Sequence, residues 1–163
     1  MPEIPMDVEL KLLRRWCLDD VDAVRLMGSL FQASQAADDV IDKGGGLPAL
    51  EDMSRLLMIY FGEIMTNAFM RRHADTLAGA IIPAISNWTA ATRWEGDSDF
   101  DEEKAVFAYV MRESLEAALV AIAFLIGGPR HAQLVRNEFS EIYHFGPGRE
   151  GLRSYIEEHG KGS

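Results

Sequence analysis

Apolar residues along this chain recur at spacings of three and four positions, which is the period of an amphipathic α-helix. The first such stretch covers residues 7–17. Its apolar stripe is formed by Leu10, Leu13 and Cys17. No apolar–polar alternation longer than four residues appears, and no hairpin dipeptide joins two β-branched runs. The pattern therefore predicts an all-α protein, a helical bundle of six or seven helices.

Capping residues and glycines predict where the early helices begin and end. Asp19 is expected to cap the second helix, which should reach Asp42 and stop at the glycines of residues 44–46. Leu47 and Pro48 then open a third helix, because proline suits the first turn. The large apolar residues of this third helix are Leu50, Met53, Leu57, Tyr60, Phe61 and Ile64.

The second half of the chain is predicted to be helical as well. Asn67 is expected to cap a long helix over residues 68–95, which Pro83 should kink or interrupt near Ile82. Residues 96–101 form a loop, and Gly127, Gly128 and Pro129 should stop the apolar helix that follows it. The remaining predicted helices cover residues 102–126, 130–145 and about 152–159.

Length and composition fit a single all-helical domain over residues 1–163, with residues 160–163 expected to be disordered. The 26 Asp and Glu against 16 Lys and Arg give a net charge of −10. This field disfavours nucleic acid and anionic membrane surfaces as partners. The apolar run at residues 117–126 is about half of the ~20 residues that span a bilayer. Without a signal-peptide pattern, we expect a cytoplasmic protein that does not enter membranes.

The candidate chemistry lies at the end of the second predicted helix. Asp38 and Asp42 are one turn apart on a common face, and Asp39 lies within reach of Asp42. The same face carries Phe31 and Val24, so the carboxylates extend an apolar stripe. In a last helical turn each carboxylate meets the negative end of the dipole, at a cost of roughly 0.3–1 kcal/mol.

Two interpretations of this acidic cluster follow. A bound hard cation would outweigh both the unfavourable interaction of the carboxylates with the helix dipole and their mutual repulsion. Mg²⁺ commonly uses one or two carboxylates together with substrate phosphates. Alternatively, the three aspartates form a solvated helix end with Lys43 and Arg112 as ionic partners. Spacing alone favours the second interpretation.

The segment Asp38-Asp39-Val40-Ile41-Asp42 resembles the aspartate-rich motif of class I isoprenoid synthases. The likeness covers residues 35–42 and the all-helical character around them. It implies a reduced isoprenoid synthase fold in which Asp38, Asp39 and Asp42 hold Mg²⁺ against a substrate diphosphate. The chain is about half the family's usual length and contains neither a second aspartate-rich motif nor an NSE-type motif, so its pattern departs from that of the catalytic members.

A second resemblance is to small helical proteins of unknown role from tailed phages and prophages. It rests on residues 34–42, on the string Thr66-Asn67-Ala68-Phe69, and on Trp88 in a helix that ends at Glu95. This resemblance implies an accessory or assembly protein whose fold carries no catalysis.

Basic residues offer candidate anion partners. Arg71 and Arg72 lie near a helix start, where backbone N–H groups favour anions. The favoured interpretation is instead a solvent-facing turn balanced by Asp75. Arg112 and Glu116 are four residues apart in an apolar helix and are expected to form a structural ion pair.

A third acidic group lies in a predicted loop. Asp97, Asp99 and Asp101 alternate like the start of an EF-hand calcium site, but the required glycine and distal glutamate do not follow. Helix capping is the favoured role.

The sequence thus leaves two classes of function. The favoured one is a non-catalytic accessory or interaction protein that assembles with itself or with a protein partner, since Met- and aromatic-rich helix surfaces suit such contacts. The alternative is a Mg²⁺-dependent protein that binds or processes a diphosphate ligand. It would use the three aspartates as metal ligands and Arg71, Arg72 or Arg112 as anion partners.

Overall fold

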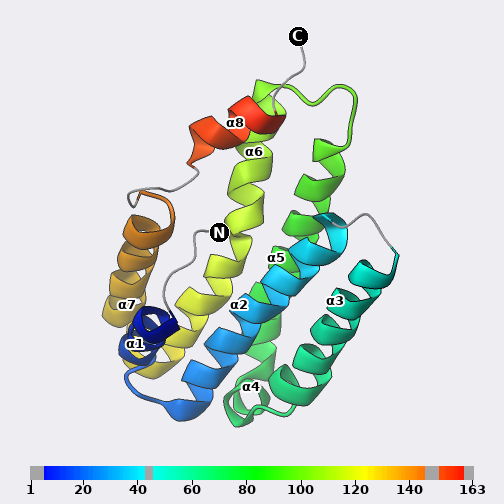
Figure 1. Ribbon diagram of the computed structural model, residues 1–163. Helices are drawn as coiled ribbons and strands as arrows, with labels where there is room; N and C mark the ends of the chain where they lie inside the picture. The colour runs from blue at the N-terminus through cyan, green and yellow to red at the C-terminus, as the bar shows by residue number, and fades with distance from the viewer. Residues whose placement is uncertain (1–5, 43–45, 146–150, 160–163) are drawn as a thin grey trace. The chain divides into compact units, whose positions relative to one another are not determined.

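The computed structural model describes residues 6–42, 46–145 and 151–159, and every regular element within them is helical (Figure 1). The predicted all-α class is confirmed. The α-helices are α1 (Met6–Trp16), α2 (Val21–Asp42), α3 (Leu47–Met58), α4 (Ala68–Arg72), α5 (Ala74–Glu95), α6 (Glu102–Arg112), α7 (Glu116–Tyr143) and α8 (Leu152–His159). A π-helix, η1 (Ile59–Ile64), continues α3, and a 3₁₀ turn, η2 (Glu113–Leu115), joins α6 to α7.

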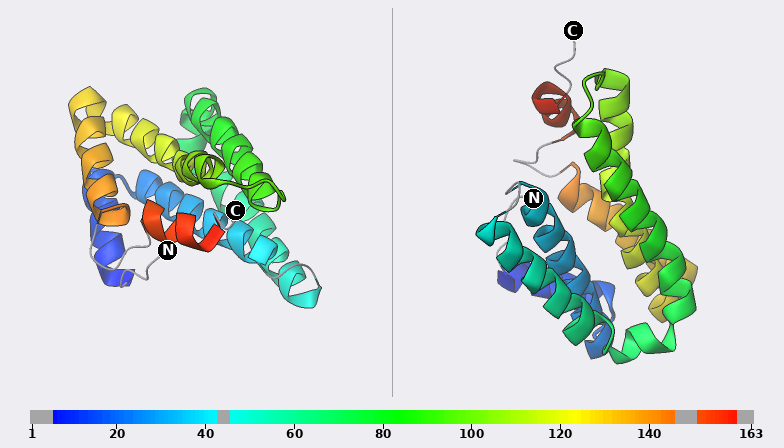
Figure 2. Two further views of the ribbon diagram at one scale, coloured as in Figure 1. Left: turned by 90° about the horizontal axis from the view of Figure 1, so that it is seen from above. Right: turned by 90° about the vertical axis from the view of Figure 1, so that its right-hand side faces the viewer.

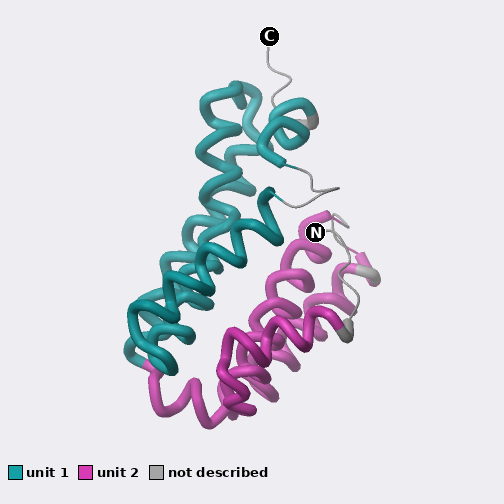
Figure 3. Tube along the Cα trace, turned by 90° about the vertical axis from the view of Figure 1, so that its left-hand side faces the viewer, with its two compact units in different colours: residues 1–5, 75–163 teal, residues 6–74 magenta. Residues whose placement is uncertain are grey.

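Two compact units make up the described chain (Figure 3). The N-terminal unit is Met6–Ala74, and the C-terminal unit contains the helices from Asp75 onward. Each unit is treated by itself below. The prediction of one domain over residues 1–163 stays a prediction, and residues 160–163 lie outside the described part of the chain.

The N-terminal unit is built around α2, which contacts α1, α3, η1 and α4. Figure 2 shows α3 running alongside α2 in both views. The apolar side chains that α2 buries are Ala23, Leu26, Met27, Leu30, Phe31 and Ala36. From α1 and its end, Leu13, Trp16 and Cys17 are buried, whereas Leu10 is 44% exposed. The predicted α1 stripe is therefore wrong at Leu10.

The start of α2 lies one residue later than predicted. Asp19 has a positive φ of 61° and does not cap the helix. Instead Asp20 accepts a hydrogen bond through Oδ1 from the backbone N–H of Ala23 at 2.9 Å, which is the N-cap geometry. The helix reaches Asp42 as predicted, and the glycine stop at residues 44–46 falls largely outside the described residues.

Asn67 caps the next helix as predicted, because its Oδ1 accepts from the N–H of Met70 at 3.0 Å. The long helix expected over residues 68–95 is divided at His73, ten residues before Pro83. The expected interruption near Ile82 is wrong, since α5 continues through Pro83. Proline has no N–H, so Pro83 cannot donate a hydrogen bond to the carbonyl of Gly79 one turn earlier. Pro83 and Gly79 are both exposed, so water can solvate that carbonyl instead.

In the C-terminal unit, the chain reverses inside α7 at the predicted stop. Gly128 has φ 75° and ψ −171°, a conformation that glycine adopts without a Cβ penalty, and Pro129 begins the returning arm. A Cβ atom at Gly127 would lie 2.6 Å from the Cβ and Cγ of His131. Glycine at both positions therefore permits a tight turn between the two arms of α7.

The opposite end of the C-terminal unit packs α5, α6 and α8 together. Ala91, Phe100, Ala105 and Ala108 form a buried cluster there. Partly buried Trp94, Met111, Tyr155 and Ile156 cover it. Within the described residues, no helix is both long enough and apolar enough to cross a bilayer.

Candidate functional site

The predicted acidic cluster lies at the C-terminal end of α2. Asp38 and Asp39 are half-buried, but Asp42 is exposed. The expectation that Asp38 and Asp42 extend the apolar face is therefore wrong for Asp42. The side chain of Asp39 is held by Arg55, whose Nη2 lies 2.6 Å from Oδ2, and by Gln35, whose Nε2 donates to Oδ1 at 3.3 Å.

Arg55 on α3 is thus the basic partner of this acidic helix end, and it was not predicted from the sequence. It also lies 3.6 Å from Oδ1 of Asp52, a carboxylate that is only 7% exposed. The expected partner Lys43 lies outside the described residues. The spacing of Asp52 and Arg55, three residues apart in one predicted helix, is the signal that could have identified them as a pair.

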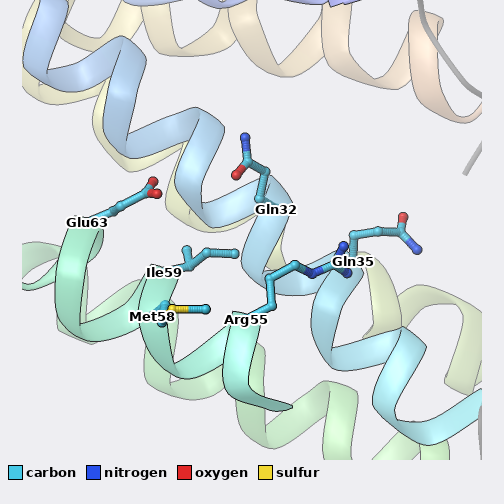
Figure 4. A pocket seen from close by; sticks show the side chains of 6 residues that line it. All are labelled: Gln32, Gln35, Arg55, Met58, Ile59 and Glu63. Atoms are coloured by element: carbon cyan, nitrogen blue, oxygen red, sulfur yellow. The ribbon is translucent and has the colours of Figure 1, made fainter. Parts of the chain in front are cut away.

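A groove of about 440 Å³ lies between α2 and the α3–η1 segment. Its lining residues are Gln32, Gln35, Arg55, Met58, Ile59 and Glu63 (Figure 4). Arg55 extends toward Gln35 on α2, whereas the Glu63 carboxylate accepts a hydrogen bond from Ser29 Oγ at 2.6 Å. The groove therefore presents one cation and one anion on separate parts of its wall, with amides on the opposing helix.

Arg71 and Arg72 lie in the last turn of α4 rather than in a first turn. The carbonyl end of α4 favours cations, and the next helix, α5, begins two residues after Arg72, at Ala74. Arg72 lies 3.9 Å from Asp22 Oδ2, and its guanidinium carbon is 5.8 Å from the ring centre of Phe69. Packing within the N-terminal unit accounts for Arg72.

Arg112 belongs to the C-terminal unit and pairs with Glu95, not with Glu116 as predicted. Its Nη1 donates to both carboxylate oxygens of Glu95, at 2.8 and 2.7 Å. The hydroxyl of Tyr155 donates to the same carboxylate. Burial, the hydrogen bond to Glu95 and the Glu95 charge all raise the pKa of Tyr155. This group joins α5, α6 and α8 through one carboxylate.

Glu116 is instead paired with Arg136 across the two arms of α7. The residue is 5% exposed, and its buried Oε1 has no hydrogen-bond partner among the described residues. His144 Nε2 lies 3.7 Å from Glu116 Oε2 and 3.8 Å from Glu113 Oε2. The arrangement fixes the returning arm of α7 against the start of the same helix.

The alternating aspartates before α6 serve the role that the sequence favoured. Asp101 is the N-cap of α6, accepting from the N–H of Lys104 at 2.8 Å. Asp99 pairs with the Lys104 ammonium group at 2.7 Å, and that hydrogen bond lowers the pKa of the Asp99 carboxyl. Across the described part of the chain, no group of three or more His, Cys, Asp or Glu is placed to hold a metal ion.

The largest apolar side chains of the α3–η1 segment face outward. Ala49, Asp52, Ile59 and Ile64 are its buried residues. On the opposite side, five residues spaced three or four apart form what we call the α3–η1 stripe: Leu50 (58% exposed), Met53 (40%), Leu57 (48%), Phe61 (62%) and Met65 (48%).

The surroundings of the α3–η1 stripe are also apolar. Leu47, Met58 and Tyr60 are exposed beside it, and Leu57, Met58, Phe61 and Gly62 line a shallow depression. The segment includes the π-helix η1, a rare conformation that occurs often at functional sites. Sequence periodicity identified Leu50, Met53, Leu57 and Phe61 of the stripe, but not Met65, and it did not reveal that they face away from α2.

No protein-family model, curated protein or solved structure matches this chain. The resemblances to isoprenoid synthases and to phage proteins therefore stay predictions.

Proposed function

We propose that this protein is a non-catalytic interaction protein that binds a protein surface through the α3–η1 stripe. The observation that carries the proposal is the outward placement of Leu50, Met53, Leu57, Phe61 and Met65 on one continuous helical segment. Contiguous apolar patches on a protein surface are typical of interaction sites.

The chemistry of the stripe supports this function. None of its five residues is charged, although charged residues make up 26% of the chain. The centres of protein interfaces are depleted in charge and enriched in aromatic residues and methionine. Two methionines and one phenylalanine therefore give the stripe an interface composition, and flexible methionines adapt to a partner's shape.

Methionine oxidation tests whether the α3–η1 stripe is covered. The purified protein is treated with dilute peroxide at low and high concentration, and also in extract of the cells that produce it. Mass spectrometry then measures oxidation at Met53, Met58 and Met65. We expect protection at high concentration or in extract, while buried Met27 stays unoxidised throughout. Equal, rapid oxidation of the three exposed methionines in every sample would show that the stripe has no partner.

A matched pair of substitutions tests the position of the surface. Phe61 is 62% exposed and Phe107, on α6 in the C-terminal unit, is 58% exposed. We expect Phe61→Glu to abolish the protection of Met53 and Met65, because it places a charge in the centre of the apolar surface. Phe107→Glu should preserve protection. Circular dichroism confirms that both variants remain folded.

The second candidate function keeps the Mg²⁺ and diphosphate role predicted for Asp38, Asp39 and Asp42. The observation that favours it is Arg55, which lies beside Asp39 and supplies a cation that can pair with a phosphate. Under this function, Mg²⁺ together with pyrophosphate raises the melting temperature, and Asp38→Asn removes that gain. A melting temperature that neither Mg²⁺, Mn²⁺ nor Ca²⁺ changes, with or without pyrophosphate, excludes it.

A further inference from the structure

We propose that the end of α7 is a proton-dependent clamp, in which protonation of His144 holds the returning arm of α7 to Glu113 and Glu116. The clamp lies within the C-terminal unit and does not depend on the α3–η1 stripe. It is carried by the position of one imidazole beside two carboxylates. Histidine is the side chain that ordinarily changes charge near neutral pH, so this position makes the contact pH-dependent.

The geometry brings three groups together from two parts of the chain. His144 is the C-cap residue of α7, and its Nε2 lies 3.8 Å from Glu113 Oε2 and 3.7 Å from Glu116 Oε2. Glu113 belongs to η2, which packs against α7, and Glu116 begins the first arm of α7. The side chain of His144 is 14% exposed and that of Glu116 is 5% exposed, so salt and water screen their interaction weakly.

The charge balance of this group favours a protonated imidazole. Glu113 and Glu116 contribute two negative charges, and Arg136, the partner of Glu116, contributes one positive charge. With neutral His144 the sum is one negative charge, and protonation brings it to zero. Burial and the Arg136 charge oppose protonation. The two carboxylates at 3.7 and 3.8 Å outweigh them, because close opposite charges favour the charged form.

Two further features favour a cation at this position. The carbonyl end of a helix attracts positive charge, and the backbone N–H of His144 closes the last turn of α7 on the Ser140 carbonyl at 2.9 Å. The buried Oε1 of Glu116 has no hydrogen-bond partner among the described residues, so this carboxylate can accept another donor. A protonated imidazole donates through both ring nitrogens and can supply that donor.

Other titratable and charged groups of the C-terminal unit near this end of α7 do not reverse the balance. Burial and then the Glu113 charge raise the pKa of Tyr109 on α6, so this tyrosine is uncharged near neutral pH. Tyr143 is uncharged in the same range. Glu141, one turn before His144, is exposed and adds negative charge. The Arg112 guanidinium pairs with a carboxylate of α5.

The sign of the stability effect follows from where the proton binds more tightly. A folded chain that holds the His144 proton more tightly than the unfolded chain is stabilised by that proton. The added stability is complete below the ordinary imidazole pKa of about 6.5, and it is lost as pH rises through the titration of the folded protein. The arms of α7 are therefore held together more firmly in mild acid than in mild alkali.

An NMR titration of the imidazole resonances tests the clamp at the residue itself. In the native full-length chain, we expect His144 to titrate with a midpoint above about pH 6.5. Glu113→Gln should lower this midpoint by about half a pH unit or more, because it removes one of the two carboxylates. The Glu113 side chain is 38% exposed, so the variant should fold. Glu103→Gln, exposed in the first turn of α6, is the control and should leave the midpoint unchanged. A native midpoint at or below 6.5, or equal shifts in the two variants, overturns the proposal.

Urea denaturation provides a second measurement. Acid also reduces the self-repulsion of a chain with a net charge of −10, so native protein is compared with His144→Gln at each pH. From pH 5.5 to pH 8, native protein should lose more of its urea midpoint than the variant does. The other three histidines are common to both proteins, so their titration cancels in the comparison. Parallel pH profiles for the two proteins contradict the clamp.

Discussion

Asp39 in the N-terminal unit and Glu116 in the C-terminal unit are both carboxylates paired with one arginine, yet their surroundings differ sharply. Asp39 has a 30% exposed side chain, and its partner Arg55 is 48% exposed. Glu116 has a 5% exposed side chain, and one of its oxygens is buried with no hydrogen-bond partner in the part of the chain that the structure describes. The first pair is in contact with water and the second is largely removed from it.

This difference in exposure means that the two ion pairs affect the free energy of unfolding to different extents. An exposed ion pair contributes about 0–1 kcal/mol, because water and salt screen it. Removing the partner of a buried carboxylate costs several kcal/mol of folding free energy, because the remaining charge is then stabilised neither by an opposite charge nor by water. The acidic motif that stands out in the sequence is therefore the weaker structural feature. The single Glu116, which is inconspicuous in the sequence, is the stronger one.

Removal of Arg136 should have the largest effect. Arg136→Met removes the arginine that pairs with buried Glu116 and leaves His144 Nε2 at 3.7 Å from its carboxylate, so we expect the free energy of unfolding to fall by about 3 kcal/mol. Arg136 is half-exposed, so the loss lies at the lower end for buried pairs. Urea denaturation measures it. The double variant Glu116→Gln/Arg136→Met should recover much of the loss, and a single variant as stable as the native chain would contradict this account.

Loss of the Tyr155 hydroxyl should have an intermediate effect. Tyr155→Phe removes its hydrogen bond to Glu95 and leaves the Arg112–Glu95 pair in place, so we expect a loss of about 1–2 kcal/mol. Thermal denaturation measures the change. Tyr109→Phe is the matched control, because its ring centre lies 5.5 Å from that of Tyr155, with the two rings tilted by 57°. An equal loss in both variants would show that the hydroxyl of Tyr155 contributes nothing specific.

High pH should weaken the N-terminal unit through Cys17. Burial, reinforced by Asp20, raises the pKa of this thiol from 9.0 to about 12. The folded chain therefore keeps its proton while the unfolded chain loses it, and stability falls as pH rises from 9 toward 12. At pH 10 the loss is about 1 kcal/mol. Urea denaturation of native protein and Cys17→Ala measures it: the pH dependence should be smaller in the variant, which retains the tyrosines.

The exposed pair should have the smallest effect. We expect Arg55→Gln to change the free energy of unfolding by less than about 1 kcal/mol, because both side chains of the Arg55–Asp39 pair contact solvent. Added salt should reduce even that difference. Ser54→Gln, one position away and also exposed, controls for altered helix propensity. A loss comparable to that of Arg136→Met would remove the distinction between the two pairs.

Local signals in the sequence predicted local structure well. Asn67 caps α4 and Gly128 turns the chain inside α7, as their conformational preferences require. The helix start at Asp19 was wrong by one residue, because either neighbouring aspartate satisfies the capping pattern and only the folded backbone selects Asp20. Of the kink or interruption expected at Pro83, the interruption was wrong, since the effect of a proline depends on whether the carbonyl one turn earlier reaches water.

The partners of the charged residues were harder to predict. Arg112 was assigned to Glu116, its neighbour four residues along the helix, but Arg112 pairs with Glu95, 17 positions away, and Glu116 pairs with Arg136, 20 positions away. Helical spacing identifies neighbours on one helix only. Contacts between helices depend on their packing, which spacing does not contain.

The sequence by itself determined the helical class, most helix limits and the position of the acidic motif, because these depend on residues close together in the chain. The tertiary structure decided that Arg55 holds Asp39, that Glu116 is buried, and that the α3–η1 stripe faces outward. An amphipathic pattern defines two faces of a helix. Which apolar residues are buried depends on the surface that the neighbouring helix offers, and α2 contacts the side with Ala49 and Ile59.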